Sequence, residues 1–466
     1  MSVPRHARPI LIGVDIGTAR IKALGLGLDG RELAQVEHPT PWTHTGNQAE
    51  MDPAELAGLI RATVAAIPAV ARRDHGSAEV VAIGVAGMAE AGVLLDARGR
   101  PLGRILAWHD PRGDVDVVRR HVGEDAFQRA VGMPLTAQPS LPKILWSRRA
   151  TGWAKSAVHF LSLPEWGVYC LGGPPVSELS LASRTGLLDT GAIAPFAGAV
   201  ALLGRNLLSE LVVAGSAAGV AKGDAVPASI RGAVLTVAGH DHQAAALAVG
   251  AARPGVLFNS MGTAEALVRC VEPLDPAAMG RLAAQGTTAG WGVVRGCYAV
   301  MEGLRTGLVL ERVASLLGAH DRSARRLLGE EAQTVDLANI PPGLVVNDAD
   351  AGLTLGPLAD GLPPAAVWAA VVRDLTAVSA RRLERIAAEV GPHAHVTLAG
   401  GWTRNAAVLA EKRRQLGEIE VSDLREPGAT GAALLAGVAA GVAESPWTDA
   451  TPWSERRVPR ANSEVS

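Results

Sequence analysis

The chain has 466 residues, a formal net charge of -2 and only 3 % aromatic residues. This length predicts two or three domains around a large core, and the small net charge gives no electrostatic reason to expect nucleic acid or a membrane as a partner. The three cysteines show neither zinc-ligand spacing nor a disulfide framework. A reducing, cytoplasmic location is therefore expected.

Two apolar runs, residues 9–14 and 21–28, open the chain on either side of a turn that contains Gly17 and Thr18. The pattern predicts two strands joined by a glycine-containing turn. A Gly-Thr turn presents backbone N–H groups and a hydroxyl at its tip, where they can hold a phosphate group. An ordinary hairpin turn is the alternative.

The next part of the chain alternates between predicted strands and helices. In order, we expect a helix over 53–70, strands over 79–86 and 93–95, helices over 114–131 and from 143, a buried helix over 160–171 and a polar loop over 179–189.

A third apolar segment begins at Ile105 and delivers three functional side chains, Trp108, Asp110 and Arg112. If this segment is a strand, alternate positions place all three on one side. Asp would accept hydrogen bonds, Arg would donate them and Trp would supply a flat wall, which suits a hydroxyl-rich ligand. A strand-end salt bridge beside a packed Trp is the alternative.

The middle of the chain carries the most concentrated signal. A predicted strand over 235–238 runs into His240, Asp241 and His242, and an Ala-rich helix follows. We interpret this as a strand, a catalytic turn and a helix. Asp241 could instead only cap the helix that follows it.

A second Gly-Thr loop, at Gly262 and Thr263, follows a linker at 252–255 and a strand over 256–258. It repeats the strand, Gly-Thr, strand layout of the N-terminus in the second half of the chain. Two such loops indicate a duplicated fold that grips a polyphosphate from both sides.

The C-terminal half adds a helix over 302–317 that carries Gly303 and Gly307, each costing roughly 1 kcal/mol of helix stability relative to Ala. Close backbone approach to a ligand or to another helix would explain them. Further elements are expected: a strand and turn region over 291–301, a long helix over 363–390, a strand over 395–399 that ends in Gly400 and Gly401, a helix from about 405, and a last helix from about 426. Strand, Gly-Gly, helix suits a nucleotide at the carboxyl end of the strand.

Taken together, these motifs resemble the FGGY carbohydrate kinases of the actin/hexokinase-like ATPase superfamily, in the family's order and over about residues 10–440. The resembling segments are the first phosphate motif from Asp15 to Lys22, the sugar-contacting segment 84–96, the Trp-x-Asp-x-Arg motif 108–112, the catalytic segment 239–241, the second phosphate motif 260–263, and the adenosine and C-terminal segments 400–405 and 426–432. The segment 343–361 looks shortened, and Ala89 stands where glycerol kinases carry Arg.

The resemblance implies an α/β fold of two ribonuclease H-like (actin-like ATPase) lobes with a cleft between them. It implies an N-terminal lobe over 9–251, with the sugar site, the first phosphate loop and the catalytic Asp. A C-terminal lobe over 252–445 would hold the second phosphate loop and the adenosine site, and a tail would cover 446–466.

The resemblance also implies an ATP-dependent kinase that phosphorylates a hydroxyl of a small neutral sugar, ketose or polyol, with Asp241 as general base. Mg²⁺ would be held by Asp15, through water, and by Asp241. The residues expected to bind ATP are Asp15, Gly17, Thr18, Lys22, Gly262, Thr263, Gly303, Gly400, Gly401, Arg404 and Asn405. Those expected to bind the acceptor are Glu90, Trp108, Asp110, Arg112, His240, Asp241 and His242.

Two other functions fit parts of the pattern. A sugar or nucleotide sensor of the same fold without turnover would suit the shortened C-terminal segment. A metal-dependent phosphohydrolase could use the His109-Asp110 and His240-Asp241-His242 pairs as ligands. The residues expected to bind the substrate include no cluster of Lys or Arg, which favours a neutral substrate. A homodimer is possible.

Overall fold

A computed structural model describes residues 7–340, 342–343, 345–348, 352–356 and 361–444. The chain forms two compact units. The first contains residues up to 252, 272–299 and 426–444, and the second contains residues 253–271 and 300–425. This differs from the single boundary expected near residue 252, because the last helix packs in the first unit. The expected tail over 446–466 lies outside the described residues.

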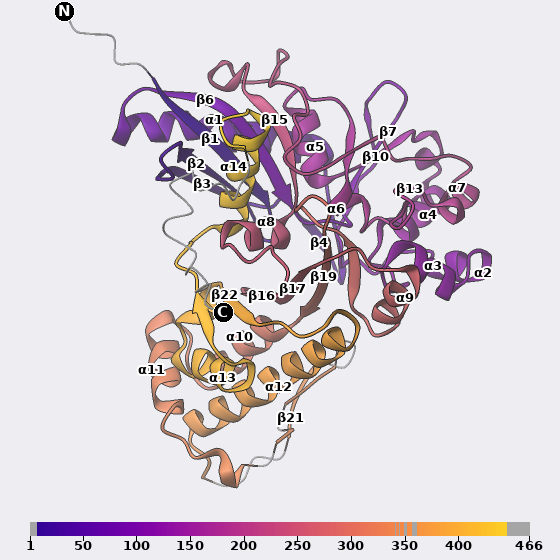
Figure 1. Cartoon of the computed structure of the whole chain (residues 1–466). Helices are drawn as coiled ribbons and strands as arrows, with labels where there is room; N and C mark the ends of the chain where they lie inside the picture. The colour runs from indigo at the N-terminus through magenta and orange to yellow at the C-terminus, as the bar shows by residue number, and fades with distance from the viewer. Residues whose placement is uncertain (1–6, 341, 344, 349–351, 357–360, 445–466) are drawn as a thin grey trace, which may run out of the picture. The chain divides into compact units, whose positions relative to one another are not determined.

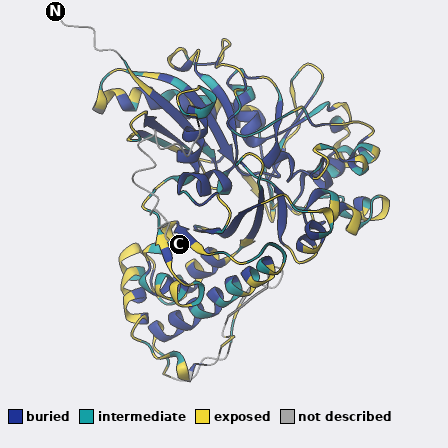
Figure 2. Ribbon diagram, in the orientation of Figure 1, coloured by how far each residue is buried: buried dark blue, intermediate teal, exposed yellow. Residues whose placement is uncertain are grey.

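A five-stranded mixed sheet forms the core of the first unit. Its order is β15-β6-β1-β2-β3, with β1 antiparallel to β2 and parallel to β6, and with β15 parallel to β6. The central strands are almost entirely buried (Figure 2). The strands are β1 (Arg8–Ile16), β2 (Arg20–Gly27), β3 (Glu32–Pro39), β6 (Ala78–Gly87) and β15 (Val234–His240).

Helices cover this sheet. Helix α1 (Pro53–His75) packs against β2, β3 and β6, and α14 (Pro427–Ala439) packs against β1 and β6. Figure 1 shows α14, in yellow, against these strands. The approach is so close that a Cβ at Gly13 would lie 1.8 Å from the carbonyl oxygen of Ala429. In the described residues, α1 alone is long and apolar enough to cross a membrane, and its packing here is that of a core helix.

The first unit also holds shorter elements that correct several predictions. The segment 114–131 forms two helices, not one, and 160–171 is a strand followed by a helix. The predicted loop 179–189 begins with a helical turn. These elements are β4 (Thr43–Thr45), β5 (Gln48–Met51), β7 (Gly92–Leu95), β8 (Pro101–Leu102), β9 (Ile105–Leu106), α2 (Val115–His121), α3 (Glu124–Val131), α4 (Ser140–Thr151), β10 (His159–Ser162), α5 (Leu163–Cys170), β11 (Val176–Glu178), α6 (Leu179–Ala182), β12 (Leu188–Asp189), β13 (Ala194–Pro195), α7 (Ala197–Leu203), β14 (Glu210–Val212), α8 (Asp241–Ala248), α9 (Pro276–Ala284) and β18 (Thr288–Trp291).

The second unit repeats the sheet plan of the first. Five neighbouring strands of the second sheet correspond, in spatial order, to the five strands of the first sheet. Strands β19, β17, β16, β22 and β23 take the places of β3, β2, β1, β6 and β15. Strand β16 is antiparallel to β17 and parallel to β22, as β1 is to β2 and β6. The duplication predicted from two Gly-Thr loops therefore extends to whole sheets. The strands are β16 (Val256–Met261), β17 (Glu265–Val271), β19 (Tyr298–Leu304), β22 (His395–Ala399) and β23 (Ile419–Val421).

Helices α10 (Thr306–Leu316), α11 (Arg322–Ala332), α12 (Pro364–Val390) and α13 (Ala406–Leu416) complete the second unit, with a short pair of strands β20 (Val345–Asp348) and β21 (Gly352–Leu355). The helix predicted from residue 302 begins at Thr306, so Gly303 lies on β19. The shortened segment 343–361 is described only in part.

Candidate active site

Asp241 is the first residue of α8, directly after β15 ends at His240. The backbone N–H of His242 donates to Oδ1 of Asp241 at 2.6 Å and to Nδ1 of His240 at 3.3 Å, so both side chains cap the first turn of α8. The backbone N–H of His240 donates to Ser180 Oγ at 3.1 Å, which fixes the chain just before Asp241. Asp241 therefore sits at the carboxyl end of a parallel strand and at a helix N-terminus, where negative charge is stabilised.

The side chain of Asp241 is one-fifth exposed, and Oδ1 lies 2.8 Å from Nδ1 of His240. Burial opposes ionisation of this carboxyl, but the neighbouring imidazoles of His242 and His240 and the hydrogen bonds they make outweigh it and lower the pKa of Asp241. Burial in turn lowers the pKa of His242. Asp241 is thus an anion at neutral pH, as a proton acceptor must be.

Glu90 lies in the turn after β6, and it is the centre of a buried polar cluster. Its Oε1 accepts from Arg184 Nε at 2.7 Å and from Gln138 Nε2 at 3.1 Å. Arg184 also donates to Thr288 Oγ1 at 2.7 Å. Glu90 is 4 % exposed and has φ 62°, a left-handed conformation that non-glycine residues rarely adopt. Such strain is concentrated at functional sites.

The charges of Asp241, His240, Arg184 and Glu90 all act on His242. The acceptor residues predicted near 90 and near 241 are therefore brought together within the first unit. Arg184 was not predicted; its position in a polar segment after α6 marked it only as a loop residue.

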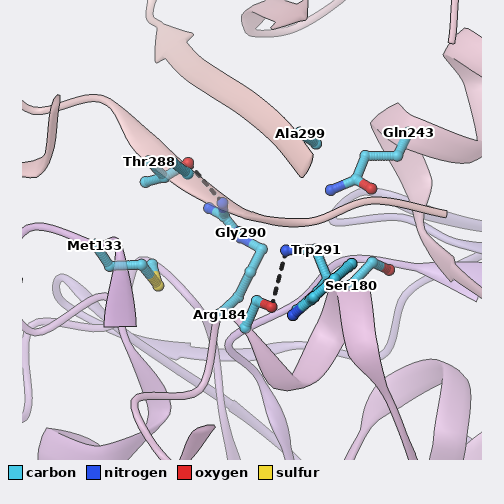
Figure 3. A pocket seen from close by; sticks show the side chains of 10 residues that line it. Met133, Ser180, Arg184, Gln243, Thr288, Gly290, Trp291 and Ala299 are labelled. Carbon is cyan, nitrogen blue, oxygen red and sulfur yellow. Dashed lines mark hydrogen bonds between the residues drawn. The ribbon is translucent and has the colours of Figure 1, made fainter. Parts of the chain in front are cut away.

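A small pocket lies beside this cluster. Figure 3 shows Arg184 reaching Thr288 across it, while Gln243 enters from α8, the helix that begins with Asp241. The lining is mostly polar, which suits a small hydroxylated ligand better than an apolar one. It consists of Met133, Ser180, Ser183, Arg184, Gln243, Thr288, Ala289, Gly290, Trp291 and Ala299.

Trp108, Asp110 and Arg112 do not lie on one strand, because β9 ends at Leu106. Both oxygens of Asp110 are occupied: Ala49 N and Arg112 Nη2 donate to Oδ2, and Arg112 Nε donates to Oδ1. Asp110 is 1 % exposed. This geometry matches the alternative of a salt bridge beside a Trp. Half-buried Trp108 instead donates from Nε1 to Thr18 Oγ1 at 3.0 Å.

Buried Lys143 ties these segments together. Its Nζ donates to the carbonyl oxygens of Trp108 at 3.0 Å and Gln138 at 2.7 Å, and also to that of Ala137. Burial lowers the pKa of Lys143 to about 8, against the opposing pull of Glu90 and Asp110. Lys143, which the sequence suggested only as a helix residue, holds the Trp108 loop against the segment that carries Gln138.

Asp15 is the penultimate residue of β1 and lies opposite Lys22 of β2. Its Oδ1 is buried, and no group in the described part of the chain hydrogen-bonds it. Burial, and then the charge of Asp241, raise the pKa of Asp15 to about 8. Lys22 forms an ion pair with Glu426 at 2.6 Å, just before α14. The sequence placed Glu426 at the start of the last helix and of the C-terminal segment 426–432, without a partner for its charge.

An unpartnered buried oxygen on Asp15, close enough to Asp241 for their charges to interact, fits a cation such as Mg²⁺. Among the described residues no group of three or more His, Cys, Asp or Glu side chains is placed to hold a metal. A Mg²⁺ ion here would therefore keep most of its water and phosphate ligands.

The predicted turn residues of the first unit, Gly17 and Thr18, form the tip between β1 and β2, where Gly17 N donates to Arg20 O at 3.0 Å. In the second unit, Gly262 and Thr263 form the tip between β16 and β17. Thr18 and Thr263 are both exposed, and Thr18 Oγ1 already accepts from Trp108 Nε1.

Two glycines pack against the second tip. A Cβ at Gly307 would lie 2.0 Å from the carbonyl oxygen of Gly262, and a Cβ at Gly400 would lie 2.4 Å from that of Met261. The backbone that closely approaches Gly307 is therefore that of the Gly262-Thr263 loop. Around Gly303 and Gly401 a Cβ would meet nothing within 4 Å.

Asn405 and Arg404 differ in exposure and in hydrogen bonding within the protein. Asn405 caps α13, accepts from Val408 N at 3.3 Å and donates to Arg325 O at 2.8 Å, and it is 5 % exposed. Its polar atoms are used within the protein. Arg404 is exposed on the turn before it, where a nucleotide could reach it.

Comparison with known proteins identifies the family and the fold. The family model for the FGGY family of carbohydrate kinases, N-terminal domain, matches residues 10–248. A xylulose kinase of Streptomyces coelicolor is 28 % identical over 451 residues, covering 92 % of this chain and 87 % of its own.

Two solved structures share the fold. A xylulose kinase from Rhodospirillum rubrum superposes with a TM-score of 0.80 at 23 % identity, over 93 % of this chain and 91 % of that one. A Plasmodium falciparum glycerol kinase with ADP superposes with a TM-score of 0.80 at 17 % identity, over 94 % of this chain and 91 % of that one. The predicted α/β fold of two ribonuclease H-like lobes is confirmed. The chain belongs to the FGGY family of carbohydrate kinases, which use ATP, and is a phosphotransferase with an alcohol group as acceptor.

Proposed function

We propose that this kinase transfers the γ-phosphoryl group of ATP to a hydroxyl of a small neutral sugar, ketose or polyol, with Asp241 as the general base. The observation that carries the proposal is the placement of an ionised Asp241 in the same unit as the Glu90–Arg184 cluster and its polar cavity. An anionic carboxylate beside a hydroxyl-binding wall can accept the proton that the attacking hydroxyl loses.

Glu90, Trp108 and His242 are proposed to bind the acceptor's hydroxyls. Glu90 offers an acceptor oxygen, His242 a ring nitrogen and Trp108 a flat face. Asp110 and Arg112 are reassigned: because they are bonded to each other and to Ala49, we propose that they position the Trp108 loop and do not touch the acceptor.

Asp15 and Asp241 are proposed to hold Mg²⁺, mainly through water. When bound, Mg²⁺ neutralises the charge of the β- and γ-phosphates during transfer. Lys22, held by Glu426, is proposed to place a positive charge beside the phosphates. Backbone N–H groups and hydroxyls at the Gly17-Thr18 and Gly262-Thr263 tips would contact phosphate oxygens.

For the base of the nucleotide, Gly400, Gly401 and exposed Arg404 remain our proposed contacts, and Asn405 is proposed to act by capping α13. The binding of ATP by Gly303 stays a prediction from the sequence. A cytoplasmic location and a homodimer likewise stay predictions.

The test is ADP release with Mg-ATP across a panel of neutral polyols, tetruloses, pentuloses and hexoses, for the wild type and Asp241→Asn. Loss of a general base lowers turnover by about 10²–10⁴-fold, so acceptor-dependent ADP release should nearly vanish. Asp116→Asn is a matched control, because Asp116 also lies in a first helical turn of the first unit but is 77 % exposed.

Turnover by Asp241→Asn within threefold of the wild type would show that another group is the base. Binding of ATP and a sugar with no phosphorylated product in the wild type would favour the sensor of the same fold.

A further inference from the structure

The Glu90–Arg184 ion pair is buried in the wall of the proposed acceptor site. The side chains are 5 % and 11 % exposed, and Nη2 of Arg184 lies 2.5 Å from Oε1 of Glu90. A buried guanidinium needs an anionic partner, because an isolated buried charge is costly. Here Glu90 is that partner, so the pair as a whole is neutral.

The hydrogen bonds leave one oxygen of Glu90 free. Arg184 Nε and Nη2 and Gln138 Nε2 all converge on Oε1. None of the described residues donates to Oε2. Glu90 therefore both neutralises Arg184 and offers an acceptor oxygen that a ligand hydroxyl can use.

One member of the pair, Arg184, lies beside the helix that begins with Asp241. Arg184 lines the cavity that Gln243 of α8 also lines (Figure 3). Glu90 and Arg184 both act electrostatically on His242, the residue after Asp241. An acceptor whose hydroxyl reaches Asp241 would therefore lie beside this pair.

We propose that the Glu90–Arg184 pair is a charge filter for the acceptor: Glu90 masks Arg184, and the site therefore takes an uncharged polyhydroxylated acceptor and rejects one that carries a carboxylate. This inference rests on the proposed kinase function and adds the residues that set its substrate class. An acceptor carboxylate would meet the Glu90 carboxylate, and like charges at short range in a buried site repel strongly.

The filter makes a specific prediction for Glu90→Gln. The amide keeps the shape of the side chain but removes the negative charge, which leaves Arg184 buried without an anion. Arg184 can then pair with a carboxylate from the ligand, and Arg–carboxylate pairs are strong and directional. The variant should therefore gain affinity for an aldonic acid and lose preference for the neutral sugar of the same chain length.

The experiment compares kcat/KM for matched pairs of neutral sugars and aldonic acids of equal length, in the wild type, Glu90→Gln and Glu90→Gln/Arg184→Gln. The expected acid-to-neutral ratio rises at least tenfold in Glu90→Gln and returns toward the wild-type value in the double variant, which has also lost the Arg184 guanidinium. Binding of each ligand by calorimetry with a non-hydrolysable ATP analogue gives the same comparison without turnover.

Glu165→Gln is the matched control. Glu165 is a buried carboxyl of the same unit, 2 % exposed, whose oxygens accept from the backbone N–H groups of Ser162 and Glu178. Replacing this buried carboxyl by an amide should leave the acid-to-neutral ratio unchanged. A melting temperature for each variant establishes that it is folded.

Three results would overturn the filter: a wild type that prefers aldonic acids, a Glu90→Gln protein that binds them no better than the wild type, or a gain that persists in the double variant. These outcomes differ from failure of the proposed function. If the wild type phosphorylates no sugar, the kinase proposal fails, while the binding comparison still decides whether the pair selects by charge.

Discussion

The two sheets carry a buried carboxylate at the same hairpin, but they treat it in opposite ways. In the first unit, Asp15 at the β1–β2 hairpin keeps one buried oxygen without a partner. In the second unit, Glu265 at the β16–β17 hairpin is fully buried and accepts from Lys412, Ser379, Thr306 and Asn259. Asp15 lies two residues before its Gly-Thr tip, on the first strand of the hairpin, and Glu265 lies two residues after its tip, on the second strand.

The difference separates two uses of one fold. A buried carboxylate that is saturated with donors and paired with a cation stabilises its hairpin and has no capacity left for a ligand. A buried carboxylate oxygen without a hydrogen-bond partner lowers the stability of the fold. Such an oxygen is typical of a site where a ligand supplies the missing interaction. We infer that the second hairpin is built for rigidity and the first for cation binding.

Lys412→Met should have the largest effect. It leaves Glu265 buried without its cation, and breaking a buried ion pair in this way costs about 3–5 kcal/mol. Urea unfolding should show a large loss of stability. Arg326→Met, which removes an exposed pair with Glu330 in the same unit, should cost no more than about 0.5 kcal/mol. Equal losses in the two variants would contradict the comparison.

Asp15→Asn should show the reverse pattern, with activity lost and stability kept. Removing a carboxylate that orients a metal's ligands typically weakens metal affinity by about 10–100-fold. The Mg²⁺ concentration for half-maximal turnover should therefore rise, while the unfolding free energy stays equal or increases because no hydrogen bond to Oδ1 is lost. Asp29→Asn, in the exposed turn after β2, is the control. A destabilised Asp15→Asn protein would show that Asp15 is structural.

The pH dependence of stability tests a third buried carboxyl, Glu165. Burial raises its pKa to about 8 in the folded protein, above its ordinary value of 4.5. Between these values the folded state binds more protons than the unfolded state, so the unfolding free energy should fall as pH rises from about 4.5 through about 8. The decline should be on the order of a few kcal/mol, and Glu165→Gln should flatten it. A wild-type profile no steeper than that of the variant would refute the assignment.

Gly307→Ala should act on the second tip. The added Cβ would displace the Gly262 carbonyl, and a shift of about 1 Å in a positioning loop can cost up to about 100-fold in rate. We expect KM for ATP to rise several-fold with acceptor KM unchanged. Gly303→Ala meets open space, so its effect should be smaller. A larger effect at Gly303 would support the sequence prediction that it lies against the nucleotide.

Particular residues show how far sequence reasoning reached. Strand and turn patterns predicted both hairpins, the strand-to-helix junction at Asp241 and the duplicated plan, because alternation and turn chemistry are local properties of a sequence. The same reasoning placed Trp108, Asp110 and Arg112 on one strand and Gly303 in a helix. Both placements are wrong because the strand at 105 ends after two residues and β19 continues to Leu304.

Local pattern thus determined the elements, the family and the position of Asp241 at the end of a strand. Tertiary structure alone decided which polar groups meet. Arg184 pairs with Glu90 across 94 residues, Lys22 with Glu426 across 404, and Lys412 with Glu265 across 147. No periodicity records such pairs, because the energy of a buried charge depends on the partner that folding delivers and not on its neighbours in sequence.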